Sequence, residues 1–331
     1  MEVPYEPVLG KMPDTVEISN SEIQTFKQCK RRWMLGNYYG LAKKESDHTG
    51  PLPLGTRVHN TLEIWYGSDD PKDEDIVDVY NRLQRKDAKL FQMSDQFNDE
   101  KAVKKFNDES TLGRIMVEGY PEWLDESGLE SKLRFVSAEE KLEARIHGLH
   151  DNRVVGIGKI DQRVERAEDG TRAVRDFKTA KDFNMYMNGG PPPEQLMLYC
   201  LLETLDHNHT NEVDGAMYTL LRKVKRSGTA KPPFYYNLDV RFNKKTMAAF
   251  WTRLWGTYND MMNVRNALDA GVDHRLVAYP TPSKDCSWIC PFYSVCPMMD
   301  DGSSADRYLE DHFKQVDPLE RYKMEEEEKH G

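Results

Sequence analysis

The spacing of apolar residues predicts that helices open the chain. Polar residues at 19–22 suit helix N-caps and apolar residues follow them at helical spacing, so we expect a first helix over about residues 21–36 that carries Cys29. A second helix is expected over residues 55–66, where apolar side chains recur every three or four positions around His59. Residues 73–126 are rich in charge and keep a helical period with few helix breakers. They predict an insertion of two or three helices.

The pattern then changes to that of a β-meander. Strands are expected over residues 135–144, 153–165 and 171–178, with Glu168-Asp169-Gly170 as the turn between the last two. The rest of the pattern predicts, in order, a helix over about 191–205, strands over 215–224 and 234–240, and a long helix over about 244–270.

Composition is typical of a globular protein. The chain has 331 residues, of which 38% are hydrophobic and 31% charged, so it can bury a sizeable core without disulfides. No stretch approaches the roughly 20 apolar residues that a membrane span requires. Residues 1–6 have neither a basic region nor an apolar core, so no secretory signal is visible and we expect a cytoplasmic protein.

The net charge of −10 argues against a protein that is coated with basic residues for indiscriminate nucleic-acid binding. Part of the negative charge lies in residues 69–78 and 325–328, which leaves room for a local basic groove. The plainest basic patch is Arg222-Lys223-Val224-Lys225-Arg226, at an expected strand end. Such a patch suits contact with a phosphate backbone.

Two carboxylates and a lysine have the pattern of a phosphodiester-cleaving site. Hydrolysis of that bond requires a divalent cation to polarise the phosphate and acidify water, and a positive group for the developing charge. Asp161 ends one expected strand stretch, and pairing with the next strand brings Asp176 and Lys178 beside it. Because side chains alternate along a strand, Asp176 and Lys178 share a face. The alternative is a salt-bridged surface hairpin, since the Asp-x-Lys pattern is common by chance.

Further polar residues support the first interpretation. Gln195 and Tyr199 are four residues apart on an expected helix and project from one face, where they suit orienting a phosphate or a water molecule. Unconnected surface polarity is the other interpretation of this pair. His59 offers an imidazole, which suits Mn²⁺ better than Mg²⁺, although a lone helical histidine is more often structural.

The cysteines suggest a second metal centre. Cys286, Cys290 and Cys296 form a C-x3-C-x5-C cluster, and Cys29 lies alone near the N-terminus. In a reducing compartment such residues are metal ligands or buried thiols more often than disulfides. The pattern fits a Cys₄ [4Fe–4S] cluster, which accepts a remote ligand. Zinc is the rival, although its sites more often show paired C-x2-C motifs. Cys200 lies in an apolar run typical of a buried thiol.

In this order the motifs resemble the PD-(D/E)XK nuclease superfamily. More narrowly, the chain is similar to the RecB/AddB-type exonuclease module and to the iron–sulfur nucleases of CRISPR adaptation, which carry one cysteine near the start and three after the core. The resemblance covers about residues 19–300. The residues that carry it are Gly55-Thr56-Arg57-Val58-His59, Gly158-x-x-Asp161, Asp176-Phe177-Lys178, Gln195-x-x-x-Tyr199, Ser21-Glu22-Ile23-x-x-Phe26-x-x-Cys29 and Cys286-Ser287-Trp288-Ile289-Cys290-Pro291 with Cys296-Pro297.

The resemblance implies an α/β fold with a central mixed sheet flanked by helices. It would form one nuclease domain over residues 19–300 with a helical insertion at about 70–130, between an extended arm over 1–18 and an acidic tail over 301–331. An iron–sulfur cluster on Cys29, Cys286, Cys290 and Cys296 would clamp the first helix onto the C-terminal segment. Two features depart from the family pattern: the first cysteine gap is x3 where many relatives have x2, and Arg175 precedes Asp176 where a proline is usual.

The resemblance also implies roles at the active site. His59, Asp161 and Asp176 would bind Mg²⁺ or Mn²⁺ together with the backbone carbonyl of Phe177, and Lys178 would position or activate the attacking water. Gln195 and Tyr199 would steady the substrate. A glutamate on the preceding strand, Glu139 or Glu140, would complete the site.

We therefore expect a metal-dependent DNA exonuclease that acts on single strands or DNA ends in repair, recombination or phage DNA metabolism, with a helicase or recombination protein as partner. Trp33, Tyr38 and Tyr39 are candidates to stack on unpaired bases. One alternative is a DNA-binding or scaffolding module without catalysis, but such a module has no need of adjacent carboxylates facing a polyanion. Another is electron transfer through the cluster, for which no flavin or nicotinamide motif is visible.

Overall fold

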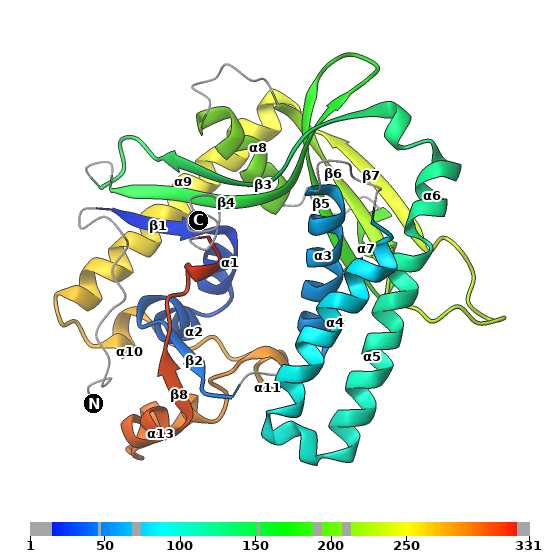
Figure 1. Ribbon diagram of the computed structural model, residues 1–331. Coiled ribbons are helices and arrows are strands. Elements are labelled where there is room, and N and C mark those ends of the chain that lie inside the picture. Colours follow the sequence, from blue (N-terminus) through cyan, green and yellow to red (C-terminus); the bar gives the residue numbers. More distant parts are fainter. Residues whose placement is uncertain are drawn as a thin grey trace, which may run out of the picture. The chain divides into compact units, whose positions relative to one another are not determined.

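The computed structural model describes residues 15–45, 48–67, 74–150, 153–187, 194–206 and 213–322. The chain forms two compact units, each assembled from separate stretches of sequence (Figure 1). The first unit contains residues 1–46, 143–158 and 248–331, and the second contains residues 47–142 and 159–247. The single nuclease domain over residues 19–300 that the sequence indicates stays a prediction.

A mixed sheet forms the centre of the second unit. Its strands are ordered β4-β5-β6-β7, with β3 also paired to β4. β4 and β5 are antiparallel, β5 and β6 are parallel, and β6 and β7 are antiparallel. The expected α/β fold with a mixed sheet is thus confirmed. The strands are β3 (Leu133–Arg145), β4 (Val154–Arg166), β5 (Arg172–Ala180), β6 (Val213–Arg222) and β7 (Tyr235–Arg241). The last residues of β3 and the first residues of β4 belong to the first unit.

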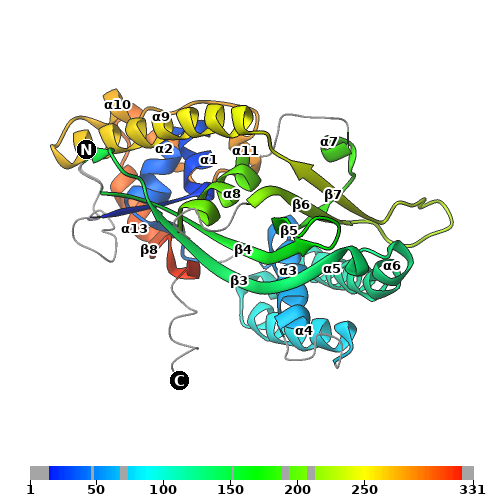
Figure 2. The same ribbon diagram turned by 90° about the horizontal axis from the view of Figure 1, so that it is seen from above.

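Helices cover both faces of this sheet (Figure 2). One face packs against α3 (Pro51–Gly67), α4 (Ile76–Gln92), α5 (Glu100–Glu118) and α6 (Tyr120–Ser127), whose apolar side chains share one core with Phe177 and Leu221. The other face carries α8 (Glu194–Asp206), which connects the parallel strands β5 and β6 after the short α7 (Asn184–Met187). The expected helical insertion corresponds to α4, α5 and α6. No helix in the described ranges is both long and apolar enough to cross a membrane.

Close packing of α5 predicts a large effect for one small substitution. A Cβ atom added at Gly113 would lie 2.3 Å from the Tyr80 hydroxyl and 2.9 Å from Leu54. We expect Gly113→Ala to destabilise the protein by about 1–3 kcal/mol, because a packed core resists extra volume. Gly256 in α9 (Lys244–Asp269) is the matched control, since a Cβ there meets nothing within 4 Å. Gly256→Ala should stabilise by about 0.5–1 kcal/mol through helix propensity. Equal shifts of both variants in urea unfolding would contradict the close packing at Gly113.

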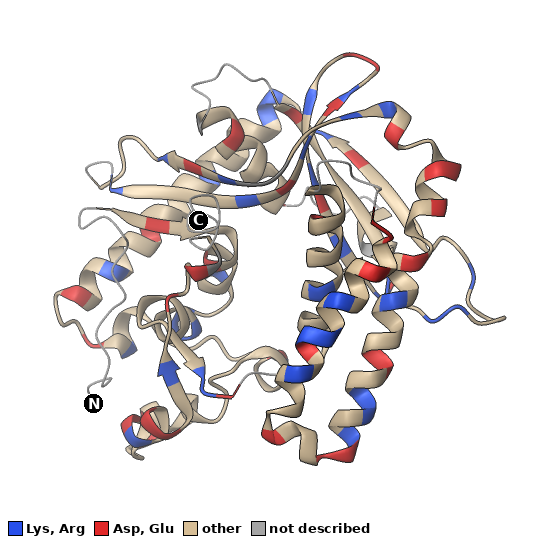
Figure 3. Ribbon diagram, in the orientation of Figure 1, with Lys and Arg blue, Asp and Glu red and all other residues tan. Residues whose placement is uncertain are grey.

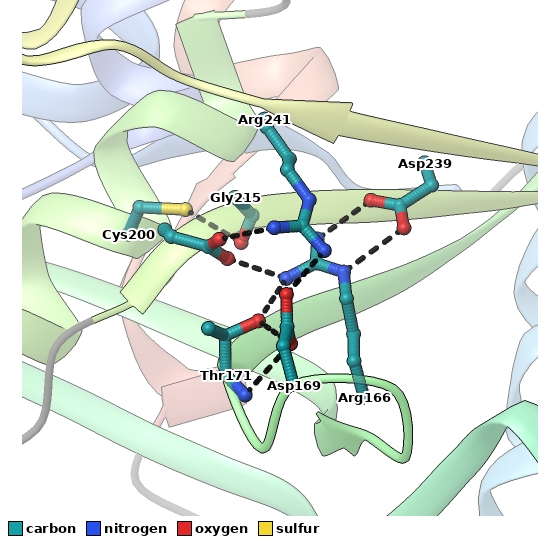
Figure 4. Close-up of polar contacts among 8 residues, drawn as sticks. Arg166, Asp169, Thr171, Cys200, Gly215, Asp239 and Arg241 are labelled. Atoms are coloured by element: carbon teal, nitrogen blue, oxygen red, sulfur yellow. Dashed lines mark hydrogen bonds and ion pairs between the residues drawn. The ribbon is translucent and has the colours of Figure 1, made fainter.

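An ionic network fastens the β4–β5 turn to the neighbouring strands (Figure 4). The buried guanidinium of Arg166, at the end of β4, donates two hydrogen bonds to Asp239 on β7, at 2.9 and 2.6 Å, and another to Asp214 on β6. Arg241 donates hydrogen bonds to Asp214 at 3.1 Å and to Asp169, in the turn, at 2.8 Å. The predicted turn residue Gly170 has φ +70, which glycine adopts without strain.

The first unit is built mainly from helices. In it β1 (Val16–Ser19) pairs in parallel with the start of β4, and β2 (Leu41–Lys43) pairs with β8 (Phe313–Gln315). Its helices are α1 (Asn20–Gln28), α2 (Lys30–Trp33), a π-helix (Met34–Tyr38), most of α9 (Lys244–Asp269), α10 (His274–Val277), α11 (Cys286–Ile289), α12 (Val295–Asp301) and α13 (Ala305–His312).

The expected helix over residues 21–36 is broken, which corrects that prediction. Cys29 has φ −160 and ψ 113, so the backbone is extended between α1 and α2. The sulfur of Cys29 accepts a hydrogen bond from the Thr281 N–H at 3.4 Å. A contact with a segment 252 residues away therefore accompanies the break, and local sequence carries no sign of it.

The proposed base-stacking role of Trp33 and Tyr38 is wrong, because both rings are buried. Trp33 is 1% exposed and its Nε1 donates to Glu22 at 2.9 Å. Tyr38 donates to Asp269 at 2.6 Å. The guanidinium of Arg265 on α9 lies over both rings, so they belong to the core of the first unit.

The chain ends differ in part from the expected arm and tail. Residues 1–14 of the arm lie outside the described residues, and the arm's last residues contribute to β1. The expected tail over 301–331 includes α13 and β8, and its Leu319 and Tyr322 pack against Ile157. The acidic run at 325–328 lies outside the described residues.

Candidate active site

Antiparallel pairing of β4 with β5 brings the two key carboxylates together. Gln162 pairs with Arg175, so Asp161 and Asp176 are the next residues along the two strands. The Phe177 N–H donates a hydrogen bond to Asp161 Oδ2 at 2.6 Å. Both carboxylates are buried, at 6% and 2% exposed. Two acidic groups so close inside a protein need a cation nearby to stay ionised.

Helix α3 supplies two polar side chains to β4. His59 Nε2 lies 2.7 Å from Asp161 Oδ2, and one turn further along the helix Glu63 forms an ion pair with Lys159 at 3.3 Å. His59 and Glu63 are four residues apart, so they share a face of the helix. The structure therefore places His59 beside the carboxylate with which the sequence grouped it.

Asp176 and Lys178 form the electrostatic centre of the site. Lys178 Nζ lies 2.8 Å from Asp176 Oδ2. Burial raises the pKa of Asp176 to about 6, against the lowering effect of Lys178, and the charge of Asp161 adds to the rise. Burial alone would lower the pKa of Lys178, but the charges of Asp176 and Asp161 outweigh it and raise that pKa. The lysine therefore stays charged, while Asp176 titrates close to neutral pH.

A stripe of polar residues on α8 faces the sheet. Gln195 Nε2 donates to Asp176 Oδ1 at 3.3 Å and to the Tyr199 hydroxyl at 2.8 Å. One turn further on, the buried Glu203 accepts two hydrogen bonds from Arg163 of β4, at 2.5 and 2.6 Å. Sequence reasoning missed Glu203 and Arg163, although Glu203 continues the four-residue spacing of Gln195 and Tyr199. This buried pair fixes the helix against the strand that carries Asp161.

Arg175, which stands where relatives often have proline, is buried on the opposite face of the sheet. Its guanidinium donates to Thr219 at 2.7 Å, to Gln162 at 3.0 Å and to the Tyr120 hydroxyl at 3.0 Å. It also lies 4.9 Å from the centre of the Phe177 ring. These contacts hold β5 in place directly behind the carboxylates.

The donor set suits a divalent cation. An imidazole, two carboxylates and nearby backbone carbonyls are ligands that Mn²⁺ accepts, and Mg²⁺ accepts the oxygen atoms. Oδ2 of Asp176 is buried and accepts no hydrogen bond, although it forms the ion pair with Lys178. Among the described residues, no three His, Cys, Asp or Glu are grouped as ligands of one ion. Instead, His59 and Lys178 contact the carboxylates directly.

The basic segment 222–226 begins at the same edge of the sheet as Lys178. Lys178 pairs with Leu220, and Ala180 pairs with Arg222 at the end of β6. Lys and Arg residues lie along the segment that connects β6 to β7 (Figure 3). Within it, Lys225 pairs with Asp108 at 2.7 Å, and the Arg226 guanidinium stacks 3.8 Å from the Phe234 ring. Glu139 and Glu140 lie on β3, but their side chains are outside the described residues.

The four candidate cluster cysteines all lie in the first unit, and none of the five cysteines forms a disulfide. Cys286 opens α11, Cys290 follows it and Cys296 lies in α12. The Ser283 N–H donates to Cys286 Sγ at 3.3 Å, and Arg31 donates to Cys296 Sγ at 3.8 Å. Burial raises the pKa of Cys290, against the lowering effect of the Phe292 N–H and Arg32, and the charges of Cys29 and Cys296 add to the rise.

Known proteins resemble this chain over most of its length. The family model of the PD-(D/E)XK nuclease superfamily matches residues 17–297. Two curated relatives are each named as a subunit of an "ATP-dependent helicase/deoxyribonuclease". The relative from Streptococcus agalactiae serotype III is 24% identical over 220 residues, which are 64% of this chain and 19% of the relative. The relative from Streptococcus mutans serotype c is 23% identical over 218 residues, 63% of this chain and 18% of the relative. The chain thus spans about a fifth of the length of these relatives.

Proposed function

We propose, because the chain belongs to the PD-(D/E)XK nuclease superfamily, that it hydrolyses phosphodiester bonds of DNA with the help of Mg²⁺ or Mn²⁺. The observation that carries this proposal is the pair of buried carboxylates, Asp161 and Asp176, beside the charged Lys178. A protein that only binds DNA gains nothing from two carboxylates close to its DNA-binding surface, because their negative charge repels the phosphates. The names of the relatives support DNA as the substrate.

Each residue has a role in this proposal. His59, Asp161, Asp176 and the carbonyl of Phe177 would hold the cation, which supplies a polarised phosphate and an acidified water when bound. Lys178 keeps its charge and would orient the attacking water or stabilise the developing negative charge. Gln195 already contacts Asp176, and with Tyr199 it would hold the phosphate in line.

The basic segment near the site and the names of the relatives support a substrate and a partner. The basic segment 222–226 starts two residues beyond the partner of Lys178 in the sheet and offers a path for a DNA backbone. We propose an exonuclease that acts on single strands or DNA ends, in repair or recombination. The relatives are named as helicase/deoxyribonuclease subunits, which supports a helicase as partner.

We further propose that Cys29, Cys286, Cys290 and Cys296 bind a [4Fe–4S] cluster. The ligands of a cluster bind different iron atoms and lie farther apart than the ligands of a single ion, so the lack of a single-ion group among the described residues is compatible with it. The N–H groups that donate to Cys29 and Cys286 support the proposal, since hydrogen bonds to sulfur are typical of such clusters. The cluster would be structural.

Digestion of end-labelled DNA tests the catalytic proposal. Anaerobically purified protein should degrade single- or double-stranded DNA with Mg²⁺ or Mn²⁺, and the label lost first would give the polarity. Asp176→Ala and Lys178→Ala should each reduce the rate by at least about 100-fold. Asp125→Ala, at an exposed position on α6, is the control and should retain activity. Intact DNA under every condition would favour the binding module.

A further inference from the structure

Three aromatic side chains near the cysteines are unusually exposed. Trp288 is 86% exposed, Tyr293 56% and Tyr279 47%. We call Tyr279, Trp288 and Tyr293 the aromatic patch. Large aromatic rings normally stay out of water because each can bury 150–250 Å². Large apolar side chains that are exposed to solvent in this way commonly belong to a binding surface.

The backbone around the aromatic patch is tied to the cysteine segments of the first unit. Trp288 lies on α11 between Cys286 and Cys290, and the Tyr293 N–H donates to the Cys290 carbonyl at 3.3 Å. Tyr279 lies beneath the ammonium group of Lys30, 5.3 Å from the ring centre. Each of the three rings therefore lies on, or contacts, a segment that carries one of the candidate cluster cysteines.

Charge around the aromatic patch is positive, in a chain whose net charge is −10. Arg31 and Arg275 are neutralised by Asp300 and Asp273. Lys27 has an interaction of its own. The remaining charged residues of segments 27–32 and 275–296 are Lys30, Arg32 and Lys284, against Asp285 alone. Positive side chains among open aromatic rings are the arrangement by which proteins bind unpaired nucleotides: bases stack on the rings and phosphates meet the cations.

We infer that the aromatic patch binds single-stranded nucleic acid, with a base stacked on Trp288 and neighbouring bases on the tyrosines. A protein partner would also cover apolar rings, but it gives no reason for the local excess of cations. A duplex fits less well, because its bases are already stacked within the helix and present no free face. The inference rests on the proposed DNA substrate but not on cleavage.

Binding of labelled oligothymidylate tests the inference. The full chain, with its cysteine centre intact, is titrated into a fluorescein-labelled oligothymidylate of about 15 nucleotides without divalent metal, and anisotropy is measured. Trp288→Ala should weaken binding by about 5- to 100-fold, and Tyr293→Ala should weaken it as well. Trp288→Phe should stay within about threefold of the parent, since it keeps a stacking ring. Binding to a duplex of equal length should change little.

Trp255→Ala is the matched control, because this tryptophan also lies in the first unit and is 38% exposed. It should bind oligothymidylate like the parent. Parental binding by both Trp288→Ala and Tyr293→Ala, with unchanged iron content and thermal midpoint, would overturn the inference and leave the patch to a protein partner. The two proposals fail separately. A protein that cleaves DNA but ignores these substitutions refutes only the patch, and one that binds through the patch without cleaving refutes only catalysis.

Discussion

Asp176→Asn is expected to abolish DNA cleavage and, in the absence of divalent metal, to stabilise the protein at pH 8. A carboxylate that binds the metal contributes several kcal/mol to the transition state, so the rate should fall by at least about 10³-fold. The stabilisation has a different origin. Burial raises the pKa of Asp176 to about 6, so the folded protein holds an ionised group at a cost that the unfolded chain does not bear.

The pH dependence gives this prediction its sign. Between the ordinary pKa near 4 and the folded pKa of about 6, the folded state binds the proton more tightly, so the contribution of Asp176 to stability falls as pH rises through that window. Two pKa units correspond to about 3 kcal/mol. The shifted pKa already includes the attraction of Lys178, so the neutral asparagine should stabilise the protein at pH 8 by up to about 3 kcal/mol. The gain should be present at pH 8 and vanish near pH 4.

Thermal unfolding with chelator, at pH 4.5 and 8, measures the effect, and Asp125→Asn at an exposed position serves as control. Adding Mn²⁺ at pH 8 should raise the midpoint of the parent but not of Asp176→Asn, because ligand binding stabilises only the state that binds it. A variant that is less stable than the parent at pH 8 would show that the ion pair with Lys178 outweighs the cost of burial.

Local pattern predicted the elements of the second unit well, and the reason is physical. Residues that alternate along a strand or recur along a helix report which face is buried, so the strands around Asp161 and Asp176 and the helix with Gln195 could be placed from sequence. Pairing of neighbouring strands then brought Asp161, Asp176 and Lys178 together. Each of these residues is close in sequence to the turn that joins their strands.

Contacts between distant segments were beyond the reach of such patterns. Arg175 meets Tyr120, 55 positions away, and Arg163 meets Glu203, 40 positions away. No periodicity in the sequence relates these partners. The break at Cys29 belongs to the same class, since neither Gly nor Pro interrupts the helical pattern there. Each compact unit likewise collects stretches from different parts of the chain, which no local pattern relates.

Cys290→Ala is expected to lose bound iron and to lower the thermal midpoint by about 5–10 °C. More than 250 residues separate Cys29 from Cys286, so a shared cluster closes a very long loop and removes much of the freedom of the unfolded chain. Cross-links over long loops contribute about 2–5 kcal/mol, and for a chain of this size each kcal/mol shifts the midpoint by about 2–4 °C. Iron analysis, visible absorbance and thermal unfolding under anaerobic conditions provide the readouts.

The fifth cysteine supplies the matched control for this substitution. Cys200 is buried in the second unit, where its thiol donates to the Gly215 carbonyl at 3.2 Å. Burial raises the pKa of this thiol far above its ordinary value, so it is an inert neutral group and not a ligand. The Cys200→Ala variant should therefore have the same iron content as the parent protein. If the Cys290→Ala variant kept both the iron content and the thermal midpoint of the parent, the cluster would be ruled out. One equivalent of zinc in the parent would instead assign the same four thiolates to a zinc site, in which a single ion closes the long loop.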